Sequence, residues 1–421
     1  MGLRLEWSKG RDKMKSDVQV AVIGGGIVGA SVLYWLARLG WTDAVLLERR
    51  ELTSGSTWHA AGNTTYFGPY PKMTALFAGS IRTYLQAEQD SGVSVGFHQT
   101  GSLRLAATPR ELDLFHVYAP RYASLGIPFH IRSPQEVAEL HPFIDTRAIH
   151  GAAHTPTDGH VDPTGATNAL AQTARKRGAS VERYCPVETV TRAPGGWALA
   201  TPKGTVTARH VVVATSFWAR EMLAPLGLNL PLYPTQHHEI ITESLPDIAA
   251  RDTELPAMRD SWVSCNVRQE RDGLLIGIYE KQPEFWALDG IPPDFKEDLL
   301  PPNLDPLMPH LERLMERMPL FASAGIKVAN NGPMCLTPDG LPLIGPVPDM
   351  AGLWLATGFN VGIGTGGGSA EILARWMTTG EPPKGLDAIH ADRFGTDMDR
   401  DAALASIREV YTRGYELPDA I

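Results

Sequence analysis

A glycine-rich turn between a strand-like run and a helical pattern constrains this chain more than any other feature. Residues 17–23 are typical of a short β-strand, and Gly24-Gly25-Gly26-Ile27-Val28-Gly29 leads from them into an apolar helical pattern over residues 30–39. In such a unit Gly24, Gly26 and Gly29 permit the tight turn, the close approach of the backbone to a pyrophosphate, and the packing of helix against strand. Free N–H groups at the helix N-terminus then bind the diphosphate.

The acid that this unit requires is Glu48. It ends a second apolar run, residues 44–47, nineteen positions after Gly29, where a carboxylate accepts hydrogen bonds from an adenosine ribose. The same glycine spacing recurs at residues 362–367, but Thr378-Thr379-Gly380-Glu381-Pro382-Pro383 stands where the strand and its acid should follow. The sequence therefore predicts one dinucleotide, bound to a Rossmann-type domain of the α/β class.

Length, charge and cysteine spacing exclude several classes of protein. The 421 residues, 43% of them hydrophobic, suit two or three packed units. A net charge of −9 without a basic stripe argues against a nucleic-acid partner, and no apolar run is long enough to predict a membrane span. Cys185, Cys265 and Cys335 have no paired spacing, so we expect neither a disulfide framework nor a metal site. Residues 1–16 lack the apolar core of a secretory signal and predict a flexible tail, which favours a cytoplasmic location.

The segment after Glu51 carries a resemblance to a known family. Residues 52–67 read Leu-Thr-Ser-Gly-Ser-Thr-Trp-His-Ala-Ala-Gly-Asn-Thr-Thr-Tyr-Phe. This segment resembles the flavin-linking segment of the dimethylglycine and sarcosine dehydrogenase family, which belongs to the D-amino-acid-oxidase-like FAD-dependent oxidoreductases. The resemblance implies FAD bonded covalently to His59, with Thr57, Ala61 and Gly62 beside it. The alternative for His59 is an ordinary core or surface histidine.

The resemblance also implies a glutathione-reductase-like FAD-binding domain that is discontinuous in sequence. We expect it to comprise residues 17–90, 155–229 and 330–395, with Val187 contacting the cofactor. In the last of these pieces, a loop over residues 357–368 should lead into a helix over residues 369–377. Backbone N–H groups of Gly358, Gly362 and Ile363 would then face the flavin, unless this loop is only a packing turn.

Residues 91–154 and 230–329 are expected to form the substrate domain, and residues 396–421 a C-terminal tail or helix. Strands expected over residues 236–242, 261–268 and 274–278 would give this domain an antiparallel sheet.

Three side chains of the substrate domain are candidates for catalysis. Pro234-Thr235-Gln236-His237 resembles a family phrase whose histidine lies near the flavin, so His237 is expected to make polar contacts or to act as acid or base. His237 and His238 should point to opposite faces of their strand. Tyr279 is expected to line the pocket or only to pack. Arg268 is expected to hold a substrate carboxylate, or otherwise to form a structural ion pair.

One departure from the family affects the substrate. Where the family usually places a pair of tyrosines, one of them lining the substrate pocket, this chain has Cys265 and Asn266. The resemblance therefore does not identify dimethylglycine or sarcosine as the substrate.

The expected activity is the oxidation of a C–N bond in a secondary or tertiary N-methyl amine or amino acid. The resulting iminium would hydrolyse and release formaldehyde, and electrons would pass to an electron-transfer flavoprotein or to oxygen. Long family members continue into a folate-binding region, which a separate subunit could supply. The alternatives are a hydroxy-acid or D-amino-acid oxidoreductase of the same fold and a non-catalytic regulatory subunit.

Overall fold

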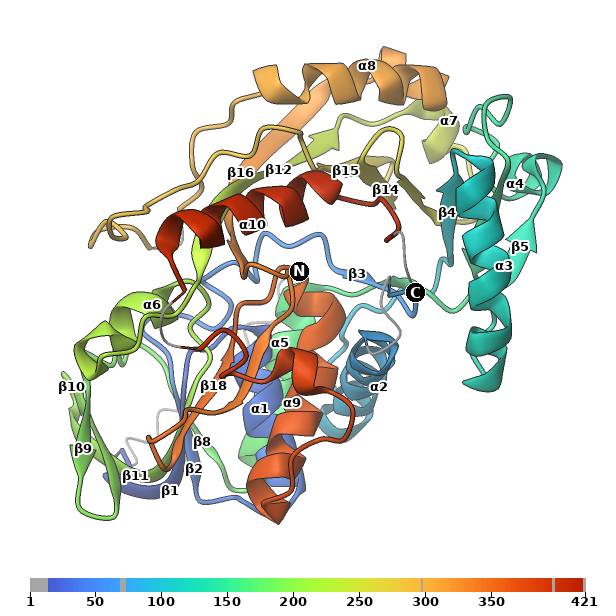
Figure 1. Ribbon diagram of the computed structural model, residues 1–421. Helices are drawn as coiled ribbons and strands as arrows, with labels where there is room; N and C mark the ends of the chain where they lie inside the picture. Colours follow the sequence, from blue (N-terminus) through green and yellow to red (C-terminus); the bar gives the residue numbers. More distant parts are fainter. Residues whose placement is uncertain (1–13, 69–72, 297, 396–397, 419–421) are drawn as a thin grey trace.

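The computed structural model describes residues 14–68, 73–296, 298–395 and 398–418, and most of the expected N-terminal tail lies outside them. The chain forms two eight-stranded sheets. Figure 1 shows the first sheet in the lower half of the molecule and the second in the upper half.

The first sheet has the order β17-β18-β11-β1-β2-β8, and β9 and β10 extend it from β11. Its strands are β1 (Asp17–Ile23), β2 (Ala44–Leu47), β8 (Ser180–Glu182), β9 (Thr189–Ala193), β10 (Gly196–Thr201), β11 (Gly204–Val213), β17 (Leu343–Pro346) and β18 (Leu353–Thr357). The strands β18, β11, β1, β2 and β8 are parallel, whereas β17 pairs antiparallel to β18. All four residues of β2 are buried, as expected of a central parallel strand.

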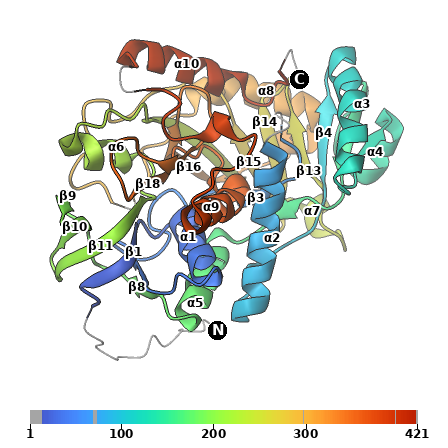
Figure 2. The ribbon, with the colours of Figure 1, turned by 60° about the horizontal axis from the view of Figure 1, so that its bottom comes forward.

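Four helices pack together beside this sheet: α1 (Ile27–Arg38), α2 (Met73–Ser91), α5 (Pro163–Lys176) and α9 (Gly362–Thr379). Figure 2 shows α1, α2 and α9 side by side. The side chain of Asp162 caps α5 by accepting the Thr164 N–H, and Pro163 takes the first helical position. The chain therefore returns from the second half of the molecule into the first at a well-capped helix.

The expected loop over residues 357–368 is wrong in its second half, because α9 already begins at Gly362. The glycines are needed there for close packing of helices. A Cβ atom added to Gly368 would lie 2.2 Å from the carbonyl oxygen of Leu76 in α2, and one on Gly366 would lie 3.1 Å from the Val28 side chain in α1. Tertiary packing thus overrides the weak helix propensity of glycine.

The second sheet has the order β16-β12-β15-β14-β13-β4-β6-β5, and its pairs are antiparallel except β13 with β4. Its strands are β4 (Ser102–Ala106), β5 (His130–Arg132), β6 (Gly151–Thr155), β12 (Tyr233–Thr242), β13 (Ala257–Asp260), β14 (Cys265–Glu270), β15 (Gly273–Ile278) and β16 (Ile326–Leu336). Together the two sheets confirm the predicted fold class. The expected domain boundary at residue 330 falls inside β16.

A turn interrupts the strand expected over residues 261–268. The carboxylate of Asp260 accepts the N–H groups of Trp262 and Val263, and Ser264 has a positive φ of 61°. The chain therefore reverses between β13 and β14 instead of continuing as one strand.

The remaining helices surround the second sheet, except α6. They are α3 (Pro109–Ser124), α4 (Pro134–Leu140), α6 (Trp218–Leu223), α7 (Pro246–Ala249), α8 (Met308–Arg317) and α10 (Arg400–Arg413), and a two-stranded ribbon pairs β3 (Asn63–Thr64) with β7 (Gly159–His160). Figure 1 shows α8 above the second sheet and α10 below it, facing the first half of the molecule. No helix in the described part of the chain has the length and apolar character needed to cross a membrane.

Candidate active site

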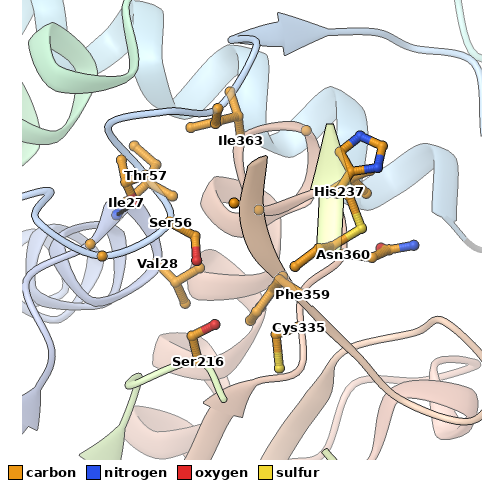
Figure 3. A pocket seen from close by; sticks show the side chains of 18 of the residues that line it. Ile27, Val28, Ser56, Thr57, Ser216, His237, Cys335, Phe359, Asn360 and Ile363 are labelled. Atoms are coloured by element: carbon orange, nitrogen blue, oxygen red, sulfur yellow. Dashed lines mark hydrogen bonds between the residues drawn. The ribbon is translucent and has the colours of Figure 1, made fainter. Parts of the chain in front are cut away.

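A cavity of about 670 Å³ lies between the two sheets and takes its walls from both. In Figure 3, Ile27, Thr57 and Ile363 belong to elements of the first half, whereas His237 projects from a strand of the second half. A cofactor bound by the first half would therefore meet the inner face of the second sheet.

The glycine turn forms the floor of this cavity. Gly24 has a φ of +109°, and a Cβ atom there would lie 2.4 Å from the Ala214 carbonyl oxygen. Gly24 and Gly26 line the cavity, whereas Gly29 lies behind them, where a Cβ atom would lie 1.9 Å from the Gly24 oxygen. The helix α1 begins at Ile27 without an acidic residue in its first turn, so its N-terminus is electropositive. This cradle fits a diphosphate.

Glu48 lies at the carboxyl end of β2 and lines the same cavity. Its carboxylate accepts the N–H of Gly25 at 2.6 Å and that of Arg50 at 2.8 Å. Burial raises the pKa of this carboxyl, although both hydrogen bonds lower it. Val187, which follows β8 in the chain, lines the same cavity. Glu48 and Val187 are therefore placed to hold the adenosine half of a dinucleotide.

The segment with His59 forms a wall between the two halves. Thr57 ties it to α1, because its hydroxyl oxygen accepts the Ile27 N–H at 3.1 Å. The His59 ring lies against Gly332 of β16, where an added Cβ atom would be only 2.3 Å from the ring. Burial lowers the pKa of the imidazole to about 4, so the ring is neutral at neutral pH. Ala61 and Gly62 continue the wall.

The N-terminus of α9 forms another part of the cavity through Gly362 and Ile363. Gly358 does not line it. This residue has a φ of +75° and packs against Thr337 and Leu232, which leaves no room for a Cβ atom. Of the three predicted contacts in this stretch, the structure brings two to the cavity.

His237 faces the cavity, and His238 faces the other side of β12, where it accepts the Asn303 N–H. The His237 Nδ1 atom lies 2.9 Å from the hydroxyl of Tyr411, which donates to the Glu280 carboxylate at 2.6 Å. Because the hydroxyl proton is used there, His237 carries its own proton on Nδ1 and leaves Nε2 as an acceptor. Burial, and secondarily the charges of His238 and His59, lower the pKa of His237 to about 3.

Tyr279 also lines the cavity and packs in a cluster of aromatic rings. Its ring centroid lies 4.8 Å from that of His237, 5.0 Å from that of Tyr411 and 5.4 Å from that of Tyr415. Burial raises the pKa of its hydroxyl, so Tyr279 stays protonated.

Arg268 lies outside the cavity wall. Its Nε donates to the Ala61 carbonyl oxygen at 2.9 Å, and its guanidinium pairs with Glu270 at 2.8 Å. For Arg268 the geometry therefore supports a structural ion pair and not a contact with a substrate carboxylate. His160 also lies outside the cavity, where its ring stacks on that of His98. One ring nitrogen of each histidine and one carboxylate oxygen of Glu254 all lie within 4.8 Å of one another.

The charged or polar side chains of the cavity that were missed from the sequence include Arg104, Arg259, Glu239 and Tyr415. Glu239 follows His237 at the strand period of two, which is the signal that could have revealed it. Burial raises the pKa of Glu239 to about 7, although Arg268 and the Ala61 backbone hydrogen bond lower it. Tyr415 comes from the segment after α10 and accepts the Asn266 side-chain N–H at 2.8 Å.

Comparison with known proteins agrees with this geometry. Residues 19–376 match the family model described as FAD dependent oxidoreductase. The chain is 41% identical over 403 residues to mitochondrial dimethylglycine dehydrogenase of Mus musculus, covering 94% of this chain and 46% of that protein. It is 32% identical to 4-methylaminobutanoate oxidase (formaldehyde-forming) of Paenarthrobacter nicotinovorans, covering 96% of this chain and 49% of that protein. The chain thus spans about half the length of these relatives.

Among solved structures, the crystal structure of L-proline dehydrogenase from P. horikoshii superposes with a TM-score of 0.78 at 25% sequence identity. The match covers 90% of this chain and 98% of that one.

Proposed function

Because this chain belongs to the family of FAD-dependent oxidoreductases, we propose that it oxidises the C–N bond of an N-methylated amine. Two relatives support the substrate class, since their names specify dimethylglycine and 4-methylaminobutanoate, which both carry N-methyl groups. The observation that carries the proposal is the meeting of the two halves at His59. Ala61, two residues later, accepts the Nε–H of Arg268 of the second sheet at 2.9 Å, and the His59 ring lies against Gly332 of β16.

FAD in this cavity would accept a hydride, with its two electrons, from the carbon next to the amine nitrogen. Gly24, Gly26 and the N-terminus of α1 would hold the diphosphate, and Glu48 the ribose. We propose that His59 bonds covalently to the flavin ring, as the resemblance implies. Its neutral imidazole is the nucleophilic form that such a bond requires.

Glu239 is suited to remove the proton of the incoming ammonium. An amine must be neutral to lose hydride, because its lone pair stabilises the iminium that forms. A carboxyl with a pKa of about 7 is matched to this transfer at neutral pH, whereas His237, with a pKa of about 3, is too weak a base. His237 instead offers Nε2 as a hydrogen-bond acceptor that orients the N–H.

A secondary N-methyl amine loses one hydride and becomes an iminium, and one water molecule then converts the iminium to the demethylated amine, formaldehyde and a proton. An electron-transfer flavoprotein or oxygen would then take up the two electrons. A folate-binding partner would capture the one-carbon unit.

The test is anaerobic mixing of the purified yellow protein with N-methyl amines, hydroxy acids and D-amino acids. The proposal predicts loss of oxidised-flavin absorbance and release of formaldehyde only with N-methyl amines. Bleaching by a hydroxy acid or a D-amino acid alone would identify the competing oxidoreductase. A protein that carries flavin but is bleached by none of these compounds would instead support the regulatory alternative.

A further inference from the structure

One row of residues crosses the inner face of the second sheet. Glu239 pairs with Gly277, Gly277 with Asn266, and Asn266 with Arg259. Arg259 in turn pairs with Arg104 across the parallel strands. Directly paired residues share a face of a sheet, and all of these except Gly277 line the cavity. The row therefore runs from a carboxyl group at one end to two arginines at the other.

Within the described chain no carboxylate forms an ion pair or hydrogen bond with the arginine end, although the charges of Asp158 and Glu111 act on it. Arg259 is only 6% exposed, and its side chain has no ion pair or hydrogen bond within the described ranges of the chain. The nearby carboxylate of Asp158 attracts it, but accepts its hydrogen bonds from Thr65, Ser102 and Tyr66.

Arg104 also has no carboxylate bound to its guanidinium within the described chain. It donates to the Tyr415 carbonyl oxygen at 3.1 Å and lies over the Phe67 ring at 4.5 Å, while its buried Nε has no partner in the described chain. Burial, and then the positive charge of Arg259, lower its pKa to about 10. Two adjacent cations, one buried and one half-buried, that form no ion pair with a carboxylate are costly unless an anionic ligand completes them.

The width of the row limits what can reach both ends. Glu239 and Arg259 are three strand spacings apart, which places their backbones about 14 Å from each other. Strand side chains stand roughly perpendicular to the sheet, so the two charged ends remain widely separated. Hydrogen bonds of about 3 Å at each end leave about 8 Å for the ligand. An α-amino acid, whose carboxylate is on the carbon next to nitrogen, is too short.

The middle of the row carries one short side chain, that of Asn266. Gly277 has none, and the Asn266 amide lies over it, since an added Cβ atom would lie 2.5 Å from Asn266 Nδ2. Asn266 is shorter than a tyrosine, and it accepts the Asn63 amide and donates to Tyr415. Glu239, Asn266 and Arg259 all line the cavity, so a carbon chain that lies over Asn266 can reach both charged ends.

We propose that the substrate carries a carboxylate several carbons from the oxidised C–N bond, with the carboxylate on Arg259 and Arg104 and the amine beside Glu239. This inference rests on the proposed amine oxidation. Arg259 and Arg104 then select the substrate by its length as well as by its charge. Asn266, which lies between Arg259 and Glu239 in the row, leaves space for the carbon chain.

The experiment measures kcat/KM for N-methylglycine, N-methyl-β-alanine, 4-methylaminobutanoate and its longer homologues, each beside the N-methylalkylamine of equal length. We expect a preference of at least about tenfold for the longer carboxylates, and Arg259→Met should lower their kcat/KM by about 100-fold while changing the alkylamines little. Arg259→Lys should recover part of the loss, since it keeps the charge but not the two-pronged geometry. Arg147→Met, at an exposed arginine that does not line the cavity, is the matched control.

Binding supplies a second measurement that does not depend on turnover. Calorimetric titration with acetate, butanoate and hexanoate should show tighter binding with increasing length, and Arg259→Met should abolish it. Asn266→Tyr should shift the preference toward N-methylglycine. The inference is overturned if N-methylglycine is the best substrate of the unaltered protein, or if Arg259→Met weakens carboxylates and alkylamines equally. Failure of every amine to bleach the flavin would refute the proposed function, whereas the carboxylate titrations would still test the arginine pair.

Discussion

His59 has to be neutral and close to both sheets to serve as a flavin anchor, and the structure gives it both properties. Its ring lies against Gly332, and burial holds its pKa near 4. We expect His59→Ala to fold and to lose the covalent link, so that acid precipitation releases all flavin into the supernatant. His160→Ala, which alters a histidine outside the cavity, should keep the flavin in the pellet. Equal retention of flavin by both variants would refute the anchor.

Glu239 is the residue whose titration should appear in the activity. With a pKa of about 7, it is ionised and able to accept a proton only above that pH, so the rate of flavin reduction should rise through about pH 7. Glu239→Gln should lower the rate by about 100-fold or more and remove this step from the pH profile. The Gln236 side chain lies on the opposite face of β12, so Gln236→Glu would leave the step in the pH profile in place. A profile unchanged in Glu239→Gln would exclude Glu239 as the base.

The residues differ in how far the sequence could reveal them. Gly24, Glu48, Thr57 and His59 lie in two contiguous segments, so spacing and resemblance place them in the cavity. The row from Glu239 to Arg104 is assembled from several strands, and Arg259 is aligned with Glu239 only through strand register. No local pattern carries that register, so the sequence predicts a role for Arg268 and does not indicate Arg259.

At the scale of elements, α9 shows the same limit. Its glycines predict a loop by intrinsic propensity, but they permit α9 to pack closely on α1 and α2. The caps of α4 and α5 were predictable, since Ser133 and Asp162 accept N–H groups of the first turn within their own segments. Local hydrogen bonds can be read from a sequence, whereas a close approach of two helices cannot.

Gly368→Ala tests this account of α9. Alanine favours a helix by up to about 1 kcal/mol over glycine, yet its Cβ atom would lie 2.2 Å from the Leu76 oxygen. We therefore expect the free energy of unfolding to fall by about 1–3 kcal/mol. Gly362→Ala is the control in the same helix, because its nearest neighbours would be 3.8 Å away. Urea unfolding compares the two, and a stabilised Gly368→Ala would contradict close packing.

At the scale of the whole molecule, buried histidines should weaken the fold in acid. His141 is 2% exposed, and burial lowers its pKa to about 4 from 6.5. Between those pH values the unfolded chain binds more protons at this site than the folded one, so this contribution to stability is lost as the pH falls. We expect the free energy of unfolding of the unaltered protein to fall relative to His141→Gln by about 1 kcal/mol per pH unit. Urea titrations at pH 7, 6 and 5 measure this difference, and parallel curves would contradict it.

The whole molecule joins a nucleotide-binding half to a second sheet, with His59 between them and a charged row above. The most direct test of this account is a single anaerobic turnover with 4-methylaminobutanoate, in which the flavin spectrum and formaldehyde are followed together. The account predicts complete bleaching with one formaldehyde released per flavin. Bleaching without formaldehyde, or an oxidised spectrum that no N-methyl amine changes, would contradict it.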